Sequence, residues 1–383
     1  MVTRRMVISR FAKTLLGLGT AALVWRSRAV QVATFLAAAA LRGQYRGHIG
    51  ARPGNRSHEW LAVPRPATPI VQLNPLTLVT YHPEYHGFDP GMAVASLTAA
   101  LRLGVGWIRT DIRWREVLPD GKLPDQETLA WYRAFLSAAS GCGLKTMVTL
   151  STPPEVVLKL ASSEKLTSWC QFVETVASVV GTQCNGFQLM NEPNNPVYRF
   201  FPFEDVASAF VRGAAIIRSV NPEAKVCINV TMELWGWRKY LADVLRRSGR
   251  SIDVVGLDHY PGTWTLGWKD QWVQVTQIAD TIASALRDSP WFDRRLAIME
   301  TGFSTNTITR NQKRQAEYFQ NVMNIAKNLR RKAVGHGILF GIYELCDGDS
   351  SAWLDPEAHF GLLTSDLKPK EAYATVKEMI ASL

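Results

Sequence analysis

Eight short apolar segments recur along the chain from residue 76 onward, and they have the aliphatic and β-branched composition of buried strands. Successive segments begin about 37 residues apart, close to the length of one strand followed by one helix. The eight predicted strands are residues 76–81, 106–112, 145–151, 186–191, 225–230, 253–259, 295–300 and 337–343. This repeated alternation restricts the chain to a parallel α/β architecture.

The stretches between the predicted strands have the three- and four-residue apolar spacing of amphipathic helices. One such stretch covers residues 169–180, and a second covers residues 272–286, before the seventh predicted strand. Asp89-Pro90 and Asp125 occur where the N-caps of the first two helices are expected.

Eight strand–helix units with continuously apolar strands predict a closed (β/α)8 TIM barrel, formed as a single domain by residues 76–383. A doubly wound open sheet is the alternative. It is disfavoured because no G-x-G-x-x-G follows the first strand and no Walker-type loop occurs in the chain.

The net charge of +10 belongs to the N-terminal segment. Residues 1–58 contain ten Lys and Arg and no Asp or Glu, so residues 59–383 carry 33 basic and 33 acidic residues. A neutral body excludes a nucleic-acid-binding surface as the reason for the basic composition.

The N-terminus carries two apolar runs, residues 14–25 and 29–41, separated by Arg-Ser-Arg. Each is shorter than the roughly 20 residues of a spanning helix but suits the apolar region of a secretory signal. We therefore expect a signal or membrane-targeting segment over 1–45, and export or membrane tethering of the protein. A twin-arginine signal at Arg4-Arg5, an uncleaved anchor and an Arg-rich transit peptide remain alternatives. A Pro-rich linker is expected over 46–75.

The five cysteines show neither CxxC pairs nor the spacing of metal ligands. An odd number in a chain with a large core argues against a disulfide framework and leaves a single bridge open. No HExxH or H-x-H spacing occurs, and we expect neither a metal nor a cofactor.

Two predicted strands end in a glutamate beside a turn-forming residue. Glu192 lies in Asn191-Glu192-Pro193 after the fourth strand, and Glu300 ends the seventh strand shortly before Gly302. One strand-end glutamate is as consistent with an exposed turn as with catalysis. Two of them supply the acid/base and the nucleophile or base that cleavage of a glycosidic bond requires.

In a parallel barrel the active site lies at the carboxyl ends of the strands. The polar and aromatic residues expected there are Tyr81, His82, Arg109, Asp111, Trp114, Asn191, Glu192, Asp258, His259, Tyr260, Glu300, Tyr343, Glu344 and Trp353.

The order of these motifs resembles the clan of retaining glycoside hydrolases built on (β/α)8 barrels, and within it families 39 and 5 most closely. The likeness covers about residues 76–383 and includes Phe360-Gly361-Leu362-Leu363 near the C-terminus. It implies that Glu192 is the general acid/base, that Glu300 is the nucleophile and that Asn191 holds the sugar 2-hydroxyl.

The resemblance also implies partners for these groups. Arg109 and Tyr260 would bond the Glu300 carboxylate. Further substrate-binding candidates are His82, Trp114, His259, Trp264, Tyr343 and Trp353. Tryptophans in loops suit a sugar groove because sugar C–H faces stack on aromatic rings, although each could equally cover the barrel end as part of the core.

The sequence departs from the clan in two places. Many relatives have a His two positions before the strand-six Tyr, whereas Asp258 occupies that position here and His259 is adjacent to Tyr260. Relatives often present a Trp on strand eight, where this chain has Tyr343.

The sequence thus predicts a retaining O-glycoside hydrolase that cleaves β-glycosidic bonds of a polysaccharide or oligosaccharide. The alternative is a catalytically silent carbohydrate-binding or envelope-biogenesis protein on the same barrel, against which the intact Arg109, Glu192 and Glu300 argue. An aldolase-type barrel is disfavoured because no Lys ends a predicted strand.

Overall fold

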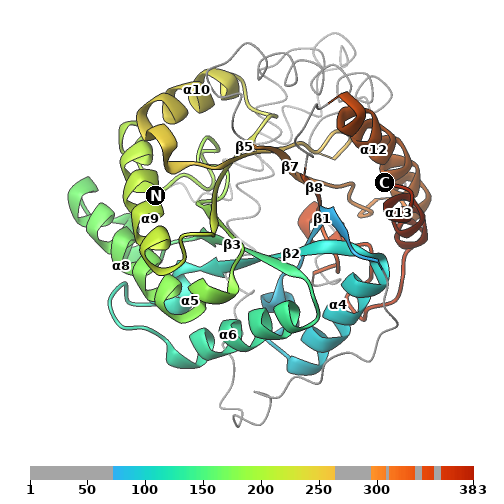
Figure 1. Cartoon of the computed structure of the whole chain (residues 1–383), viewed down its shortest axis with the longest axis horizontal. Helices are drawn as coiled ribbons and strands as arrows, with labels where there is room; N and C mark the ends of the chain where they lie inside the picture. Colours follow the sequence, from blue (N-terminus) through green and yellow to red (C-terminus); the bar gives the residue numbers. More distant parts are fainter. Residues whose placement is uncertain (1–71, 264–294, 308–309, 333–338, 349–354) are drawn as a thin grey trace, which may run out of the picture.

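The computed structural model describes residues 72–263, 295–307, 310–332, 339–348 and 355–383. Eight parallel strands close into one barrel in sequence order, because β8 pairs with β1. Helices surround this barrel (Figure 1). The predicted TIM barrel is confirmed, and the open-sheet alternative is excluded.

All eight predicted strands are present with small shifts of their ends. They are β1 Asn74–Thr80, β2 Val105–Arg113, β3 Lys145–Ser151, β4 Gly186–Leu189, β5 Lys225–Thr231, β6 Val254–Asp258, β7 Arg295–Thr301 and β8 Leu339–Ile342. β1 begins at Asn74, inside the stretch expected to be linker.

The described helices occupy the segments between the strands. The α-helices are α4 Pro90–Leu103, α5 Trp114–Val117, α6 Gln126–Gly141, α7 Glu155–Leu158, α8 Ser162–Val180, α9 Phe203–Val220, α10 Trp237–Ser248, α12 Gln312–Lys332 and α13 Glu371–Ala381. Short 3-10 turns are η2 Pro83–His86, η3 Gly181–Gln183, η4 Gly249–Ser251 and η5 Pro356–His359. The helix expected over 272–286 lies outside the described residues.

Local sequence explains where the first helices begin. The side chain of Asp89 accepts from the N–H of Met92 at 2.9 Å, and that of Asp125 accepts from Thr128 at 3.0 Å. Both predicted N-caps are therefore confirmed. Such a cap contributes about 1 kcal/mol, because it satisfies an N–H that has no partner within the helix.

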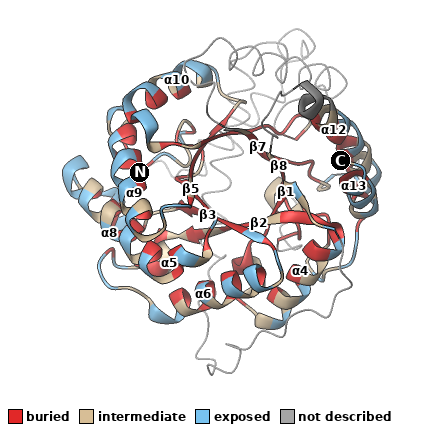
Figure 2. Ribbon diagram, in the orientation of Figure 1, coloured by how far each residue is buried: buried red, intermediate tan, exposed pale blue. Residues whose placement is uncertain are grey.

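The main core lies between the barrel wall and the surrounding helices. On α8 the predicted apolar stripe is buried, including Trp169, Phe172 and Val176. Buried residues follow the strands and the inner sides of the helices, and exposed residues lie on the outer sides (Figure 2).

Inside the barrel, side chains form layers of different character. A lower apolar layer consists of Leu78, Met147, Cys227, Val254, Ala297 and Met299. Nearer the carboxyl ends, the buried residues on the same alternating positions are polar: Thr80, Arg109, Thr149, Gln188, Asn229 and Asp258. Glu300 joins this polar layer although it lies outside the alternation of β7. The apolar layer is therefore structural, and the polar layer forms the floor of a site.

β7 contains an irregularity that decides where Glu300 points. The pairing of β7 with β6 shifts register after Leu257 pairs with Ile298, so that Asp258 pairs with Glu300. Met299 lies in the apolar interior layer, and Thr301 hydrogen-bonds Tyr318 of α12 on the outside. Met299 and Glu300 thus both face inward, because a bulge interrupts the alternation.

Within the described residues, no helix is long and apolar enough to cross a membrane. The cysteines Cys142, Cys170, Cys184, Cys227 and Cys346 are all free thiols. The expected targeting segment and most of the expected linker lie outside the described residues.

Candidate active site

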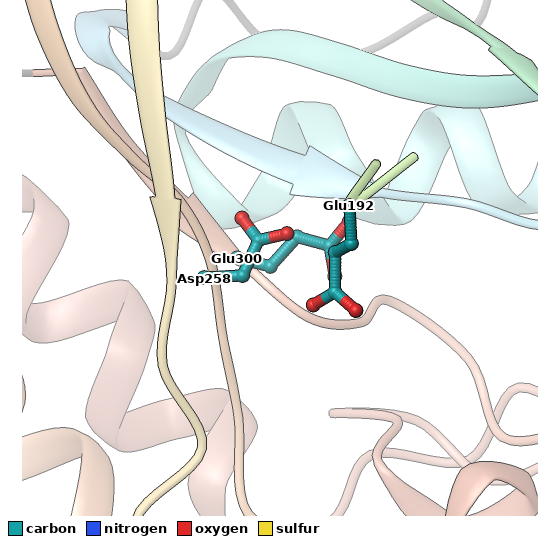
Figure 3. A group of neighbouring side chains, drawn as sticks. All are labelled: Glu192, Asp258 and Glu300. Atoms are coloured by element: carbon teal, nitrogen blue, oxygen red, sulfur yellow. The ribbon is translucent and has the colours of Figure 1, made fainter. Parts of the chain in front are cut away.

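Glu192 and Glu300 lie together at the carboxyl end of the barrel. One carboxyl oxygen from each, together with one from Asp258, lie within 4.8 Å of one another (Figure 3). Glu192 and Glu300 are each about 5% exposed, and Asp258 is fully buried. The strand ends therefore bring together the two glutamates singled out in the sequence and add a third carboxyl group.

Glu300 is held by the two residues expected to contact it. Arg109 Nη2 lies 2.6 Å from Glu300 Oε1, and the Tyr260 hydroxyl donates to Glu300 Oε2. Arg109, on β2, is itself held by residues of β4 and β1. Its Nε donates to Gln188 Oε1 and its Nη1 donates to Thr80 Oγ1, each at 3.2 Å. Burial and the charge of Glu300 raise the pKa of Tyr260 well above its ordinary value. Its hydroxyl therefore remains a donor.

Glu192 follows β4 in a left-handed backbone conformation, which hydrogen bonds with neighbouring residues hold in place. Its φ is +41°, in the left-handed region, where a non-glycine residue is strained by about 1–3 kcal/mol. Asn229 Oδ1 accepts from the Glu192 N–H at 2.9 Å, and Asn195 donates from its backbone N–H to Glu192 O at 2.7 Å. Asn195 Nδ2 also donates to Glu192 Oε2 at 2.7 Å. Asn229 and Asn195 thus fix both the backbone and the carboxyl group.

The amide of Asn191 is oriented by three donors. Its Oδ1 accepts from Asn229 Nδ2 at 2.9 Å, from Gln188 Nε2 at 3.1 Å and from Arg109 Nη2 at 3.4 Å. Because these three donors occupy Oδ1, the Nδ2 group is directed away from the polar layer of the barrel. Asn191 is also partly exposed. The side chain is therefore arranged to donate a hydrogen bond into the site.

Asp258 ends β6 beside these groups. Its Oδ2 accepts from Asn229 Nδ2 at 2.5 Å. Burial and the neighbouring charges of Glu300 and Glu192 raise the pKa of Asp258 well above its ordinary value, although Arg109 opposes the shift.

His259 turns away from the three carboxyl groups. Its Nδ1 lies 2.7 Å from Oε1 of Glu233, which also accepts from the backbone N–H of Tyr260 at 3.0 Å. Although burial opposes it, the charge of His259 lowers the pKa of Glu233. His259 therefore anchors the turn that carries Tyr260, and its predicted contact with substrate stays a prediction.

His82 belongs to a buried ionic cluster next to the site. Its Nδ1 lies 3.2 Å from Glu84 Oε1, and its Nε2 lies 3.5 Å from Glu344 Oε2. Glu84 also pairs with Arg113, whose charge lowers the pKa of Glu84 to about 2 in spite of burial. Burial, followed by the charges of Asp347 and Glu84, raises the pKa of Glu344. His82 thus links the ends of β1 and β8.

The aromatic candidates have different outcomes. Trp114 is fully buried and stacks on Phe172, with ring centroids 5.1 Å apart and planes at 1°. The prediction that Trp114 contacts a sugar is therefore wrong, because both faces of its ring are enclosed in the core. Tyr343 lies at the end of β8 and packs edge-on against Tyr260, with ring centroids 5.7 Å apart. The candidates Trp264 and Trp353 lie outside the described residues.

Sequence reasoning missed the amides that organise this site. Gln188, Asn195 and Asn229 were not among the candidates, although each contacts Arg109, Glu192 or Asn191. The available signal was a polar residue inside an otherwise apolar predicted strand, as in Phe187-Gln188-Leu189 and Ile228-Asn229-Val230. We assign no metal ligands here, because Arg109 already supplies the positive charge that Glu300 meets.

Solved structures share this barrel. No protein-family model and no curated protein matches the sequence. A GH5_18 protein from Streptomyces cattleya, solved in complex with GlcNAc, superposes with a TM-score of 0.65 at 17% identity, covering 81% of this chain and 80% of the other. An exo-β-1,4-mannosidase from an Opitutaceae bacterium (strain TAV5) superposes with a TM-score of 0.64 at 16% identity, covering 80% and 59%. A family 1 β-glucosidase from Thermotoga maritima superposes with a TM-score of 0.59 at 14% identity, covering 75% and 85%.

The barrel is the one found in glycoside hydrolases of families 5 and 1. At these identities the likeness is one of fold, and function has to be argued from the site. The likeness to family 5 expected from the sequence is thus found at the level of the fold, while the likeness to family 39 stays a prediction.

Proposed function

We propose that this protein is a retaining glycoside hydrolase that cleaves β-glycosidic bonds of an oligosaccharide or polysaccharide. The observation that carries the proposal is the meeting of Glu192 and Glu300 at the carboxyl end of the barrel, with carboxyl oxygens within 4.8 Å. Retaining enzymes have carboxyl groups about 5–5.5 Å apart, whereas inverting enzymes keep about 6.5–9.5 Å for a water molecule. The short separation favours direct attack by one carboxylate.

Glu300 is suited to the role of nucleophile. Its two oxygens receive hydrogen bonds from Arg109 and Tyr260, which orient the carboxylate and offset its charge. In the first step, Glu300 bonds to the anomeric carbon while the bond from that carbon to the leaving oxygen breaks. The result is a covalent glycosyl-enzyme.

Glu192 is suited to the role of acid and then base. It gives a proton to the leaving oxygen in the first step and takes one from the attacking water in the second. Water then forms a bond to the anomeric carbon, the bond to Glu300 breaks, and both carboxyl groups regain their starting states. Asn191 is placed to donate from Nδ2 to a sugar hydroxyl near the same carbon.

The proposed substrate class is based on the solved structures that share this fold. Solved relatives carry GlcNAc, or are a mannosidase and a glucosidase. We therefore propose a β-linked hexose or N-acetylhexosamine unit as the substrate class. Export or membrane tethering through the basic, acid-free N-terminal segment remains part of this proposal. Mass spectrometry of the mature N-terminus tests it, and an intact Met1 in soluble cytosolic protein would contradict it.

The function is tested by screening aryl β-glycosides and polysaccharides with the wild type and with Glu300→Gln. We expect hydrolysis by the wild type, loss of at least three orders of magnitude in the variant, and a first product with the β configuration by proton NMR. Unchanged turnover in Glu300→Gln refutes the assignment of the nucleophile. Binding of glycans without turnover by the wild type supports a catalytically silent carbohydrate-binding protein instead.

A further inference from the structure

Asp258 is the one carboxyl group of the site that the two-glutamate mechanism does not use. It lies at the end of β6, its side chain is fully buried, and it converges with Glu192 and Glu300 (Figure 3). Its pairing with Glu300 across β6 and β7 results from the bulge in β7, so the two residues lie side by side on neighbouring strands.

The charges around Asp258 do not balance if all three acids are ionised. The groups that face it are Glu192 after β4, Asn229 from β5, Glu300 from β7 and Arg109 from β2. Arg109 is already engaged with Glu300 at 2.6 Å. His259, the next residue in the chain, instead pairs with Glu233. Three carboxylates against one guanidinium would leave uncompensated negative charge in a buried pocket, which is strongly unfavourable.

The hydrogen bonds of Asp258 indicate which form is present. Oδ2 accepts from Asn229 Nδ2 at 2.5 Å. Oδ1 is buried and has no hydrogen-bond partner among the described residues. An ionised carboxylate with one buried oxygen unsatisfied would bear a much larger desolvation cost than a neutral carboxylic acid in the same place.

We propose that Asp258 is a positioning residue that remains a neutral carboxylic acid while Glu300 is ionised, with its proton on Oδ1 directed at the space between Glu192 and Glu300. The inference rests on the proposed function for its role, but not for its protonation state. By staying neutral, Asp258 leaves a single negative charge on Glu300 for Arg109 to match. It also leaves the proton of Glu192 available for the leaving group. The raised pKa of Asp258 agrees with this assignment.

The protonation state can be read without any substrate. The infrared C=O stretching band of neutral carboxylic acids at pH 7 should be weaker in Asp258→Asn than in the wild type. Glu155→Gln, which removes an exposed carboxylate paired with Lys159, should leave that band unchanged. Asp258→Ser replaces the Asn variant in this comparison if Asp258→Asn does not fold. An unchanged band in the Asp258 variant overturns the proposal.

The positioning role is read from activity. Asn keeps the size of Asp and offers an N–H donor, so Asp258→Asn should lose about tenfold in kcat, whereas the apolar Asp258→Leu should lose at least 100-fold. Equal losses in the two variants, with both folded, overturn the role as a neutral donor. If the wild type hydrolyses no glycoside, the proposed function fails, while the infrared comparison still decides whether Asp258 carries a proton.

Discussion

The side-chain oxygen of Asn229 accepts a hydrogen bond from the backbone N–H of Glu192 at 2.9 Å. The same residue donates from Nδ2 to Asn191 and Asp258. One amide on β5 therefore positions the backbone of Glu192 and the side chains of Asn191 and Asp258.

Asn229→Ala should lower kcat/KM by about 100-fold, because Glu192 loses the bond that holds its left-handed backbone. The free energy of unfolding should fall by about 1–3 kcal/mol. Asn221→Ala is the matched control, since Asn221 Nδ2 donates to Gly181 O and Cys184 O, outside the site. It should cost similar stability and leave kcat unchanged. Steady-state kinetics and urea unfolding distinguish the two, and an equal loss of kcat in both would argue against a positioning role.

Glu192→Ala should affect substrates according to their leaving group. A leaving group that departs readily as an anion does not need a proton, whereas a sugar or alkyl leaving group does. The ratio of kcat/KM values for the two kinds of substrate should therefore shift by about 100-fold or more relative to the wild type. A uniform loss across leaving groups would show that Glu192 is not the acid.

Tyr260→Phe removes one of the two donors that contact Glu300 in the described part of the chain. A hydrogen bond to a charged group contributes about 1.5–3 kcal/mol, so kcat should fall by about 10- to 100-fold with a smaller effect on KM. Tyr373→Phe is the control, because the Tyr373 hydroxyl donates to Ala99 O on the outside of the barrel. Michaelis parameters for both variants test the prediction, which fails if they match.

Trp114→Ala should destabilise the protein by about 3–5 kcal/mol, since its ring is enclosed by Phe172, Trp169 and Phe200. Trp235, which is 81% exposed, should tolerate the same change within about 0.5 kcal/mol. Denaturant unfolding of the two variants provides the comparison. A mild effect at Trp114 would restore the interpretation that its ring faces a ligand.

Glu116 should make stability depend on pH near neutrality. Burial raises its pKa from 4.5 to about 7, although Arg113 opposes the shift. Because the folded-state pKa of Glu116 lies above the unfolded value, its contribution to the free energy of unfolding is complete below about pH 4.5. This contribution is lost as pH rises through about 7. Glu116→Gln should remove this loss, which is on the order of 3 kcal/mol. Chemical denaturation between pH 4 and 8 checks it, and parallel curves for wild type and variant would contradict it.

Much of the fold could be predicted because strands covered on both sides are mostly apolar and recur at a regular spacing. The predicted fourth strand, residues 186–191, is two residues longer than β4, for a local reason. β4 ends at Leu189 because Met190 and Glu192 take positive φ values, which a run of apolar letters does not reveal.

The site was predictable in its charged residues and not in its amides. A glutamate at a strand end is conspicuous, whereas Gln188 and Asn229 gain meaning only when their side chains are known to point into the barrel. Trp114 shows the opposite difficulty. A tryptophan just beyond a strand end can face solvent or the core, and only the position of Phe172 decides.

The bulge in β7 has a consequence for anyone who redesigns or aligns this chain. Counting β7 residues alternately as inside and outside would assign Glu300 to the helix-facing side, where Thr301 in fact meets Tyr318. Making the strand regular while keeping all of its residues would turn the Glu300 carboxylate out toward α12 and away from Arg109, whereas deleting Met299 together with the bulge would leave Glu300 facing inward. The inward orientation of Glu300 therefore depends on the register shift in β7, and transplanted strands must preserve that parity.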